Sequence, residues 1–202
     1  MNENRKLRQS ALGINELRGC VHLGMKRDAL NLARRTLKQT DIAEKDFSEA
    51  VNAILVQADK CKQWSPVVEA AYARLSKHDK QAVRRWMLYF CSASKNYEAA
   101  IKFIPRRFVG EFDLTELAFT CETWLMLKRM DEMDRLAKKL SLAIGQAAHP
   151  FMRTMLARHL GEYYARKGLW NKAVEAWEFV QLDYIFFQEA VEGIVDIHVA
   201  GA

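Results

Sequence analysis

The chain has 202 residues, of which 50% are hydrophobic and 28% are charged, and these proportions are typical of a folded globular protein rather than a disordered one. Its 31 Lys and Arg residues against 25 Asp and Glu residues give a formal net charge of +6, which makes an acidic partner plausible without favouring nucleic acid. Only 3 Pro and 9 Gly residues interrupt the chain, and alternating β-branched residues are scarce. The composition therefore predicts an all-helical protein.

In chain order, apolar residues recur at helical spacing and are separated by short polar turns, which predicts pairs of antiparallel helices. Residues typical of helix N-caps support several of the expected starts, namely Ser65 before Pro66, then Asn96, Asp113 and Asp131. Five helix pairs are expected, approximately over residues 9–38, 46–77, 79–104, 113–143 and 150–182. An apolar segment over residues 185–199 is expected to form a final helix that covers the last pair.

The fifth pair has the clearest pattern. Basic residues precede Gly168, and a glycine permits the left-handed turn that ends a helix. Gly161 and Ala173 are small where two antiparallel helices must approach, while Tyr164 and Trp177 are large enough to fill the wider gaps. Two helices joined by one short turn cannot bury both apolar stripes, so the pair needs stacked neighbours.

This pair resembles the tetratricopeptide repeat, a helix-turn-helix unit of about 34 residues, at Leu160, Gly161, Tyr164, Gly168, Ala173 and Trp177. Four earlier residues align with Gly168, namely Gly24, Lys62, Lys95 and Lys128. Five positions after each turn stands a small or apolar residue: Ala29, Val67, Ala100, Met133 or Ala173. The resemblance implies a right-handed α-solenoid that forms one domain over residues 1–202. A related α-solenoid with the same hairpins is the structural alternative.

In such arrays the first helix of each pair lines a concave groove that holds a partner. The offsets of the family place nine residues of this chain there: Arg18, His22, Asn52, Asp59, Arg85, Tyr89, Glu122, Arg158 and Glu162. Family members that grip an acidic C-terminal tail use a Lys followed four residues later by an Asn, and no such pair stands here. The resemblance thus implies a cytoplasmic, non-enzymatic scaffold that binds a protein, as a peptide or helix of mixed charge.

No motif predicts catalysis, a cofactor or a metal. The sequence lacks a phosphate-binding loop, a dinucleotide-binding glycine motif and a nucleophile elbow. Its five His residues do not have metal-ligand spacing, so an enzyme would need a pocket that joins scattered carboxylates or thiols. The four cysteines are dispersed, which fits a reducing cytoplasm, and Cys20, Cys91 and Cys121 fall in packing positions.

Two further features of the sequence concern membranes and nucleic acids. The first ten residues do not form a signal peptide, and no stretch approaches the length of a membrane-spanning helix, so no membrane partner is expected. Basic doublets recur at Lys26–Arg27, Arg34–Arg35, Arg84–Arg85, Arg106–Arg107, Lys128–Arg129 and Lys138–Lys139. Most doublets are explained by hydrated helix ends. They leave a basic nucleic-acid-binding helical repeat as the alternative function.

Overall fold

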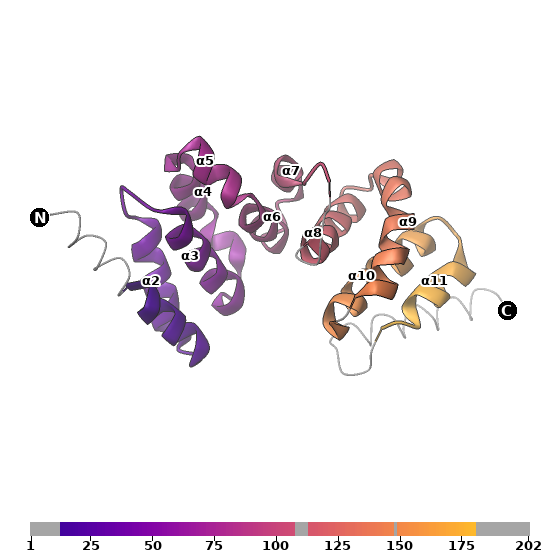
Figure 1. The fold of residues 1–202 in the computed structure, drawn as a ribbon, viewed down its shortest axis with the longest axis horizontal. Helices are drawn as coiled ribbons and strands as arrows, with labels where there is room; N and C mark the ends of the chain where they lie inside the picture. The colour runs from indigo at the N-terminus through magenta and orange to yellow at the C-terminus, as the bar shows by residue number, and fades with distance from the viewer. Residues whose placement is uncertain (1–12, 108–112, 148, 181–202) are drawn as a thin grey trace, which may run out of the picture. The chain divides into compact units, whose positions relative to one another are not determined.

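The computed structural model describes residues 13–107, 113–147 and 149–180, and every regular element in these ranges is a helix (Figure 1). The prediction of an all-α chain is therefore confirmed. The chain was expected to form one domain, and its contacts fall into two compact units, Met1–Phe103 (unit 1) and Ile104–Ala202 (unit 2). The expected helix over residues 185–199 lies outside the described residues.

The described part of unit 1 begins with a helix over residues 13–22. The elements that follow are α2 (Lys26–Leu37), α3 (Glu44–Gln57), η1 (Cys61–Trp64), α4 (Ser65–Arg74), α5 (Lys77–Ala82), α6 (Arg84–Ala93), α7 (Tyr97–Ala100) and η2 (Ile101–Phe103). The helix α3 packs against both α2 and α6. It can do so because apolar residues occupy more than one of its faces, and Phe47, Val51 and Ile54 are fully buried.

The described part of unit 2 consists of α8 (Asp113–Met126), α9 (Met130–Gln146), α10 (Pro150–Arg166) and α11 (Trp170–Trp177). The helix α10 contacts each of the other three, so it carries the core of this unit. Leu156 and Ala157 are fully buried on it, and α9 contributes the fully buried Met133 and Leu140. Apolar burial of this kind is the main stabilising term of a small helical unit.

The same backbone turn occurs four times in the described chain. Gly24, Lys95, Lys128 and Gly168 have positive φ angles of 67°, 59°, 55° and 70°. Each residue donates its N–H to the carbonyl three positions earlier, and the next residue donates to the carbonyl five positions earlier, with N···O distances of 2.8–3.2 Å. This pair of bonds is the Schellman motif, which satisfies the last carbonyls of a helix. The predicted equivalence of these four turns is confirmed.

The residue five positions after each turn is also equivalent in the four cases. Ala29, Ala100, Met133 and Ala173 are all fully buried. Each donates its N–H to the carbonyl of the residue just before its helix, at 2.9–3.3 Å. The turn and the start of the second helix therefore repeat together as one unit.

The second hairpin departs from this pattern, and its predicted turn at Lys62 is wrong. Lys62 lies inside η1, which runs directly into α4, and α3 has already ended at Gln57 with an extended residue after it. Val67, expected in the buried position, is half-buried, whereas Val68 is fully buried. Because η1 continues into α4, Ser65 is the first residue of that helix rather than its N-cap.

The close approach predicted at Gly161 is confirmed. A Cβ built on Gly161 would overlap the indole of Trp177, so the ring of α11 lies directly over the backbone of α10. The indole N–H of Trp177 points to the carbonyl oxygen of Arg158 at 3.4 Å. The glycine thus allows a large aromatic side chain to pack between two antiparallel helices.

We expect Lys95→Gly and Lys128→Gly each to raise the free energy of unfolding by about 0.5–1 kcal/mol, because glycine removes the Cβ strain of a left-handed residue. The matched substitution Lys62→Gly should not stabilise the protein, since Lys62 lies in a right-handed 3-10 helix. Urea unfolding followed by circular dichroism measures all three. Equal effects at the three positions would contradict the assignment of the turns.

Gly161→Ala should lower the free energy of unfolding by about 1–3 kcal/mol, because the added methyl group forces the Trp177 ring away from α10. Gly145→Ala is the control, since Gly145 is an exposed residue of α9 whose Cβ would meet no atom within 4 Å. This control should be neutral or stabilising by up to about 1 kcal/mol through helix propensity. Thermal melts of the two variants, and the fluorescence of the indole, distinguish the two outcomes.

Candidate functional site

Three of the nine predicted binding residues lie on two neighbouring helices of unit 1. Arg18 and His22 are exposed on the helix over residues 13–22, and Asn52 is half-buried on α3. The Arg18 guanidinium forms an ion pair with Glu49 of α3, which ties the two helices together. A second tie joins their C-terminal ends, where the side-chain amide of Gln57 donates to the carbonyl of Val21 at 3.2 Å.

Asp59 was expected on the first helix of the second pair, and the structure corrects this position. Because α3 ends at Gln57, Asp59 lies beyond the helix, and its exposed carboxylate forms an ion pair with Lys26 at the start of α2. The error follows from the wrong turn at Lys62, which placed the end of the first helix too late in the chain. Asp59 nevertheless remains at the same end of unit 1 as His22, because Lys26 follows the turn after His22.

This end of unit 1 exposes large apolar side chains that the sequence analysis did not single out. Leu23 is 72% exposed and Met25 is 44% exposed in the turn before α2, and Val56 is 60% exposed near the end of α3. The contacts between Gln57 and Val21 and between Lys26 and Asp59 hold that turn against the end of α3. We call Leu23, Met25 and Val56 the apolar end of unit 1.

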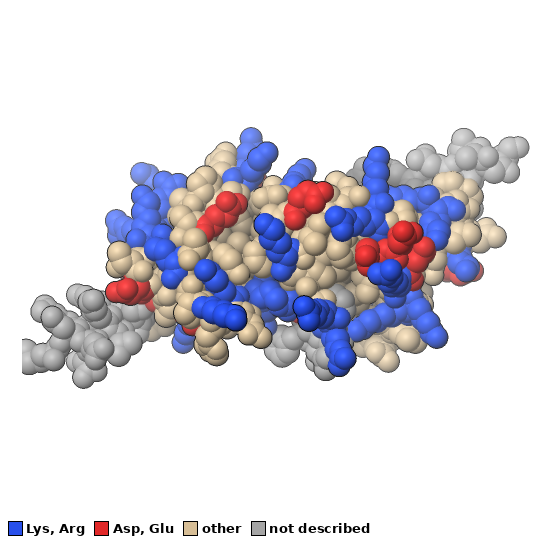
Figure 2. Space-filling view, turned by 90° about the horizontal axis from the view of Figure 1, so that it is seen from above, with Lys and Arg blue, Asp and Glu red and all other residues tan. Residues whose placement is uncertain are grey.

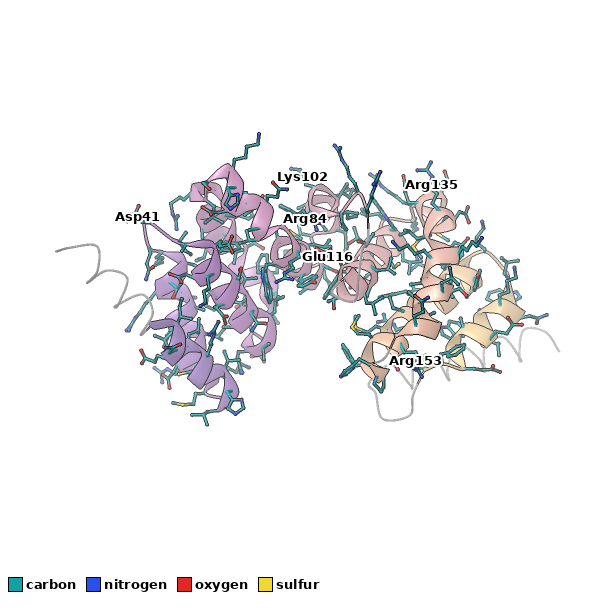
Figure 3. The ribbon with its side chains drawn as sticks, viewed as in Figure 1. Asp41, Arg84, Lys102, Glu116, Arg135 and Arg153 are labelled. Carbon is teal, nitrogen blue, oxygen red and sulfur yellow. The ribbon has the colours of Figure 1, made fainter. Side chains whose placement is uncertain are left out.

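Two further predicted residues lie on α6. Arg85 is exposed, and its guanidinium carbon lies 5.7 Å from the centre of the Trp86 ring. Tyr89 is half-buried, with its ring edge-on to Trp86 at 5.7 Å between centroids. The preceding Arg84 turns towards η2 and donates to the carbonyl of Phe103 at 2.6 Å (Figure 3). The helix therefore presents an Arg and two aromatic rings, a combination that is frequent at protein interfaces.

The remaining predicted residues lie in unit 2, and all three are half-buried. Glu122 is on α8, whereas Arg158 and Glu162 are on α10. The Glu162 carboxylate forms an ion pair with Arg166, and the same guanidinium donates to the carbonyl of Leu125 at the end of α8. Glu162 thus helps to join α10 to α8, and its charge is already paired.

A polar cluster connects α9 and α10 in the same unit. The Asp134 carboxylate accepts hydrogen bonds from the Tyr163 hydroxyl and from the Lys167 ammonium, the latter at 2.6 Å. The bond from Lys167, and then that from Tyr163, lower the pKa of Asp134, while the bond to Asp134 raises the pKa of Lys167. Burial and the neighbouring carboxylate raise the pKa of Tyr163 to about 12. Every group keeps its usual charge near neutral pH, so the cluster acts as a structural tie rather than a proton relay.

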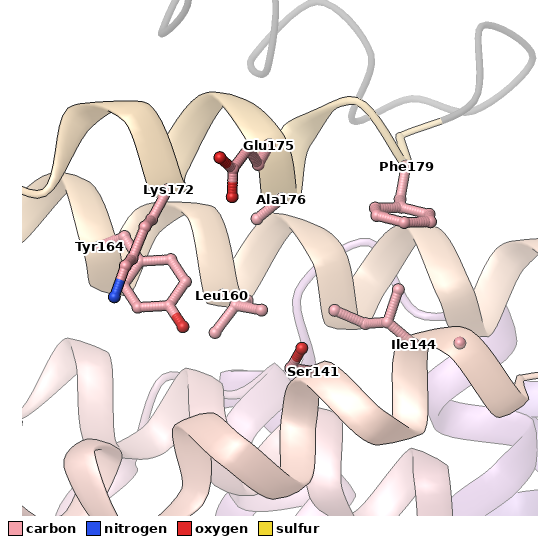
Figure 4. Close-up of a pocket in the computed structure, with 9 residues that line it drawn as sticks. Ser141, Ile144, Leu160, Tyr164, Lys172, Glu175, Ala176 and Phe179 are labelled. Carbon is pink, nitrogen blue, oxygen red and sulfur yellow. The ribbon is translucent and has the colours of Figure 1, made fainter.

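A shallow groove of about 280 Å³ lies between α9, α10 and α11 (Figure 4). Tyr164 and Lys172 stand at one end of the groove, and Ile144 and Phe179 stand at the other. The ammonium of Lys172 is 5.8 Å from the centre of the Tyr164 ring. The lining contains no pair of hydrogen-bonded titratable groups, so it favours apolar contact over chemistry.

The four cysteines are all free and buried, including Cys61 at the start of η1. Burial raises the pKa of Cys61, and it raises the pKa of Cys91 and Cys121 to about 12. A thiol with a raised pKa is a poor nucleophile, so these side chains serve as packing groups. Among the described residues, no cluster of His, Cys, Asp or Glu could hold a metal ion, and no helix could cross a bilayer.

No protein-family model, characterised protein or solved structure matches this chain. The likeness to the tetratricopeptide repeat thus rests on the residues and turns of the chain itself.

His159 of α10 is an unusual buried group beside the predicted binding residue Arg158. It is 2% exposed, and neither ring nitrogen has a hydrogen-bond partner in the described part of the chain. Burial, and then the charge of Arg158, lower the pKa of His159 from 6.5 to about 3. The imidazole is therefore neutral in the folded protein, while the unfolded chain binds a proton below about pH 6.5.

Since the unfolded state binds more protons in this range, stability should fall as the pH drops from 6.5 towards 3. We expect His159→Leu to remove this pH-dependent loss of stability. In the unmodified protein the loss amounts to about 2 kcal/mol between roughly pH 7.5 and pH 5. The exposed His78 provides the control, and His78→Gln should keep the pH dependence of the unmodified protein. Urea unfolding at the two pH values tests this, and a parallel loss of stability in all three proteins would contradict it.

Proposed function

We propose that this chain is an α-solenoid of the tetratricopeptide-like type that works as a non-enzymatic scaffold and binds a protein partner through its first helices. The observation that carries the proposal is the exposed apolar end of unit 1, which stands beside His22, Asn52 and the ion pair of Lys26 with Asp59. A water-exposed apolar group with a polar rim is the usual composition of a protein-binding surface.

The repeated turns support the solenoid part of the proposal. Four turns share one hydrogen-bond pattern, and four equivalent residues after them are fully buried. Repeated helix pairs of this kind bury their apolar stripes against neighbouring pairs and leave one side of the first helices for a ligand. Four free cysteines in the chain support a cytoplasmic location for such a scaffold.

The proposed partner is a peptide or helix that carries both apolar and charged groups. Leu23 and Val56 offer apolar contact. Asn52 lies on α3 with Val56, and Arg18 lies on the helix that ends just before Leu23. An amphipathic helix with apolar residues at helical spacing would satisfy both parts of this surface. On α6, Arg85 with Trp86 and Tyr89 would extend the same contact along the first helices, where such residues contribute most of the binding energy.

Selection of a display library of random short peptides on the purified protein tests the proposal. We expect enriched peptides to bear apolar residues at helical spacing and to bind Leu23→Asp/Val56→Asp at least about tenfold more weakly, because charges replace the apolar contacts. The control is Met126→Asp/Leu142→Asp, which places two charges on exposed apolar residues of unit 2 and should bind normally. Failure to enrich any peptide, or equal binding by both variants, would contradict the proposal.

A further inference from the structure

Basic side chains gather at the opposite end of unit 1, where α2 and α4 finish and α5 begins. Arg34 and Arg35 lie in the last turn of α2 and Lys38 follows it. Arg74 ends α4, while Lys77 and Lys80 lie on α5. We call these six residues the basic end of unit 1. Figure 2 shows the molecule from above, and on that face Lys and Arg are more extensive than Asp and Glu.

The six residues share one end because Arg74 joins the helices that carry them. Its guanidinium donates to the carbonyls of Leu37 and Gln39, at 2.5 and 3.3 Å, and so closes the C-terminal end of α2. Arg74 thereby occupies the carbonyl of Leu37, the last residue of α2, while backbone N–H groups bond the carbonyls of Arg34, Arg35 and Thr36.

Four of the cations also lack an acidic partner. Arg34, Arg35, Lys38 and Lys77 form no ion pair within the described part of the chain, and all four are exposed. Four acidic residues belong to the same region, namely Asp41 in the loop after α2 (Figure 3), Glu44 and Asp46 in the first turn of α3, and Asp79 on α5. The Asp79 carboxylate accepts a hydrogen bond from the hydroxyl of Ser76, which is the N-cap residue of α5. The region therefore keeps a net positive charge.

Aromatic rings hold two of the cations in place. The guanidinium carbon of Arg34 lies 4.8 Å from the centre of the Trp64 ring, and the ammonium of Lys80 lies 5.5 Å from the centre of the Tyr72 ring. Lys80 also donates to the carbonyl of Ala73 at 3.0 Å. Side chains that are already ordered lose less conformational entropy when they bind an anion.

The basic end offers no large apolar group for a protein partner. The exposed large apolar residues described in unit 1 are Leu23, Met25 and Val56, which form its other end. A protein interface normally needs buried apolar or aromatic anchors, and stable attachment to a lipid surface needs an apolar signal beside the charges. Binding to phosphates needs neither, because release of counterions provides the free energy.

We propose that the basic end of unit 1 binds the phosphodiester backbone of a nucleic acid without reading its sequence. Guanidinium groups such as those of Arg34 and Arg35 can donate two hydrogen bonds to one phosphate, and Lys38 adds a third charge one helical turn from Arg34, about 6 Å along α2. Contacts of this kind fix the position of a strand but carry no base specificity. This inference concerns a different surface from that of the proposed protein partner and does not depend on it.

Fluorescence anisotropy with a labelled oligouridine of about 20 nucleotides tests the inference. We expect affinity to fall about a hundredfold between roughly 50 and 200 mM salt, as for about five phosphate contacts to a single strand. Arg34→Gln/Arg35→Gln/Lys38→Gln should weaken binding at least about tenfold at low salt and reduce the slope of log affinity against log salt by about 2.

The matched control is Lys60→Gln/Lys62→Gln/Lys95→Gln, which removes the same charge from exposed residues outside the basic end and should bind RNA nearly as the unmodified chain does. Circular dichroism melts verify that both triple variants remain folded. Equal weakening by the two variants, or binding that does not depend on salt, would overturn the inference. Preferential binding of polyglutamate, or of anionic phosphatidylserine vesicles, over the RNA would also overturn the inference.

Discussion

Each regular hairpin in the described chain depends on one backbone constraint, which is that its first helix ends on a residue with positive φ. In this conformation two N–H groups turn back onto the last carbonyls, and the chain leaves in the direction that begins an antiparallel helix. Gly24 and Gly168 meet the constraint without strain, whereas Lys95 and Lys128 meet it with a Cβ present. The residue five positions after each turn is then fully buried, and it is Ala29, Ala100, Met133 or Ala173.

The sequence predicts the turn where a glycine marks it, as at Gly24 and Gly168, and it predicts close packing of two helices where side-chain size indicates it. The contact between Gly161 and Trp177 can be predicted, because a small and a large residue stand at positions that face each other in two antiparallel helices. The sequence does not predict the backbone conformation of Lys62, because a lysine has no preference that distinguishes a left-handed turn from a 3-10 helix. Lys62, Lys95 and Lys128 are the same residue type, and only the surrounding packing gives the first of them another conformation.

The candidate site is less predictable than the fold, because it depends on contacts between residues far apart in the chain. Arg18 and Glu49 are 31 residues apart, and no local pattern indicates their ion pair. The exposure of Leu23 and Val56 depends on how two hairpins meet, whereas an apolar residue near a helix end is normally expected to be buried. By contrast, the start of α5 could have been predicted, since Ser76 and Asp79 have the spacing of a helix cap.

The division of unit 1 into an apolar end and a basic end has a consequence for what the chain can join. The helix α2 runs between them for 12 residues, or about 18 Å. Two ligands seated at its opposite tips would not compete for space, and each would raise the local concentration of the other. Under the two proposals, α2 would hold two unlike ligands at its opposite ends.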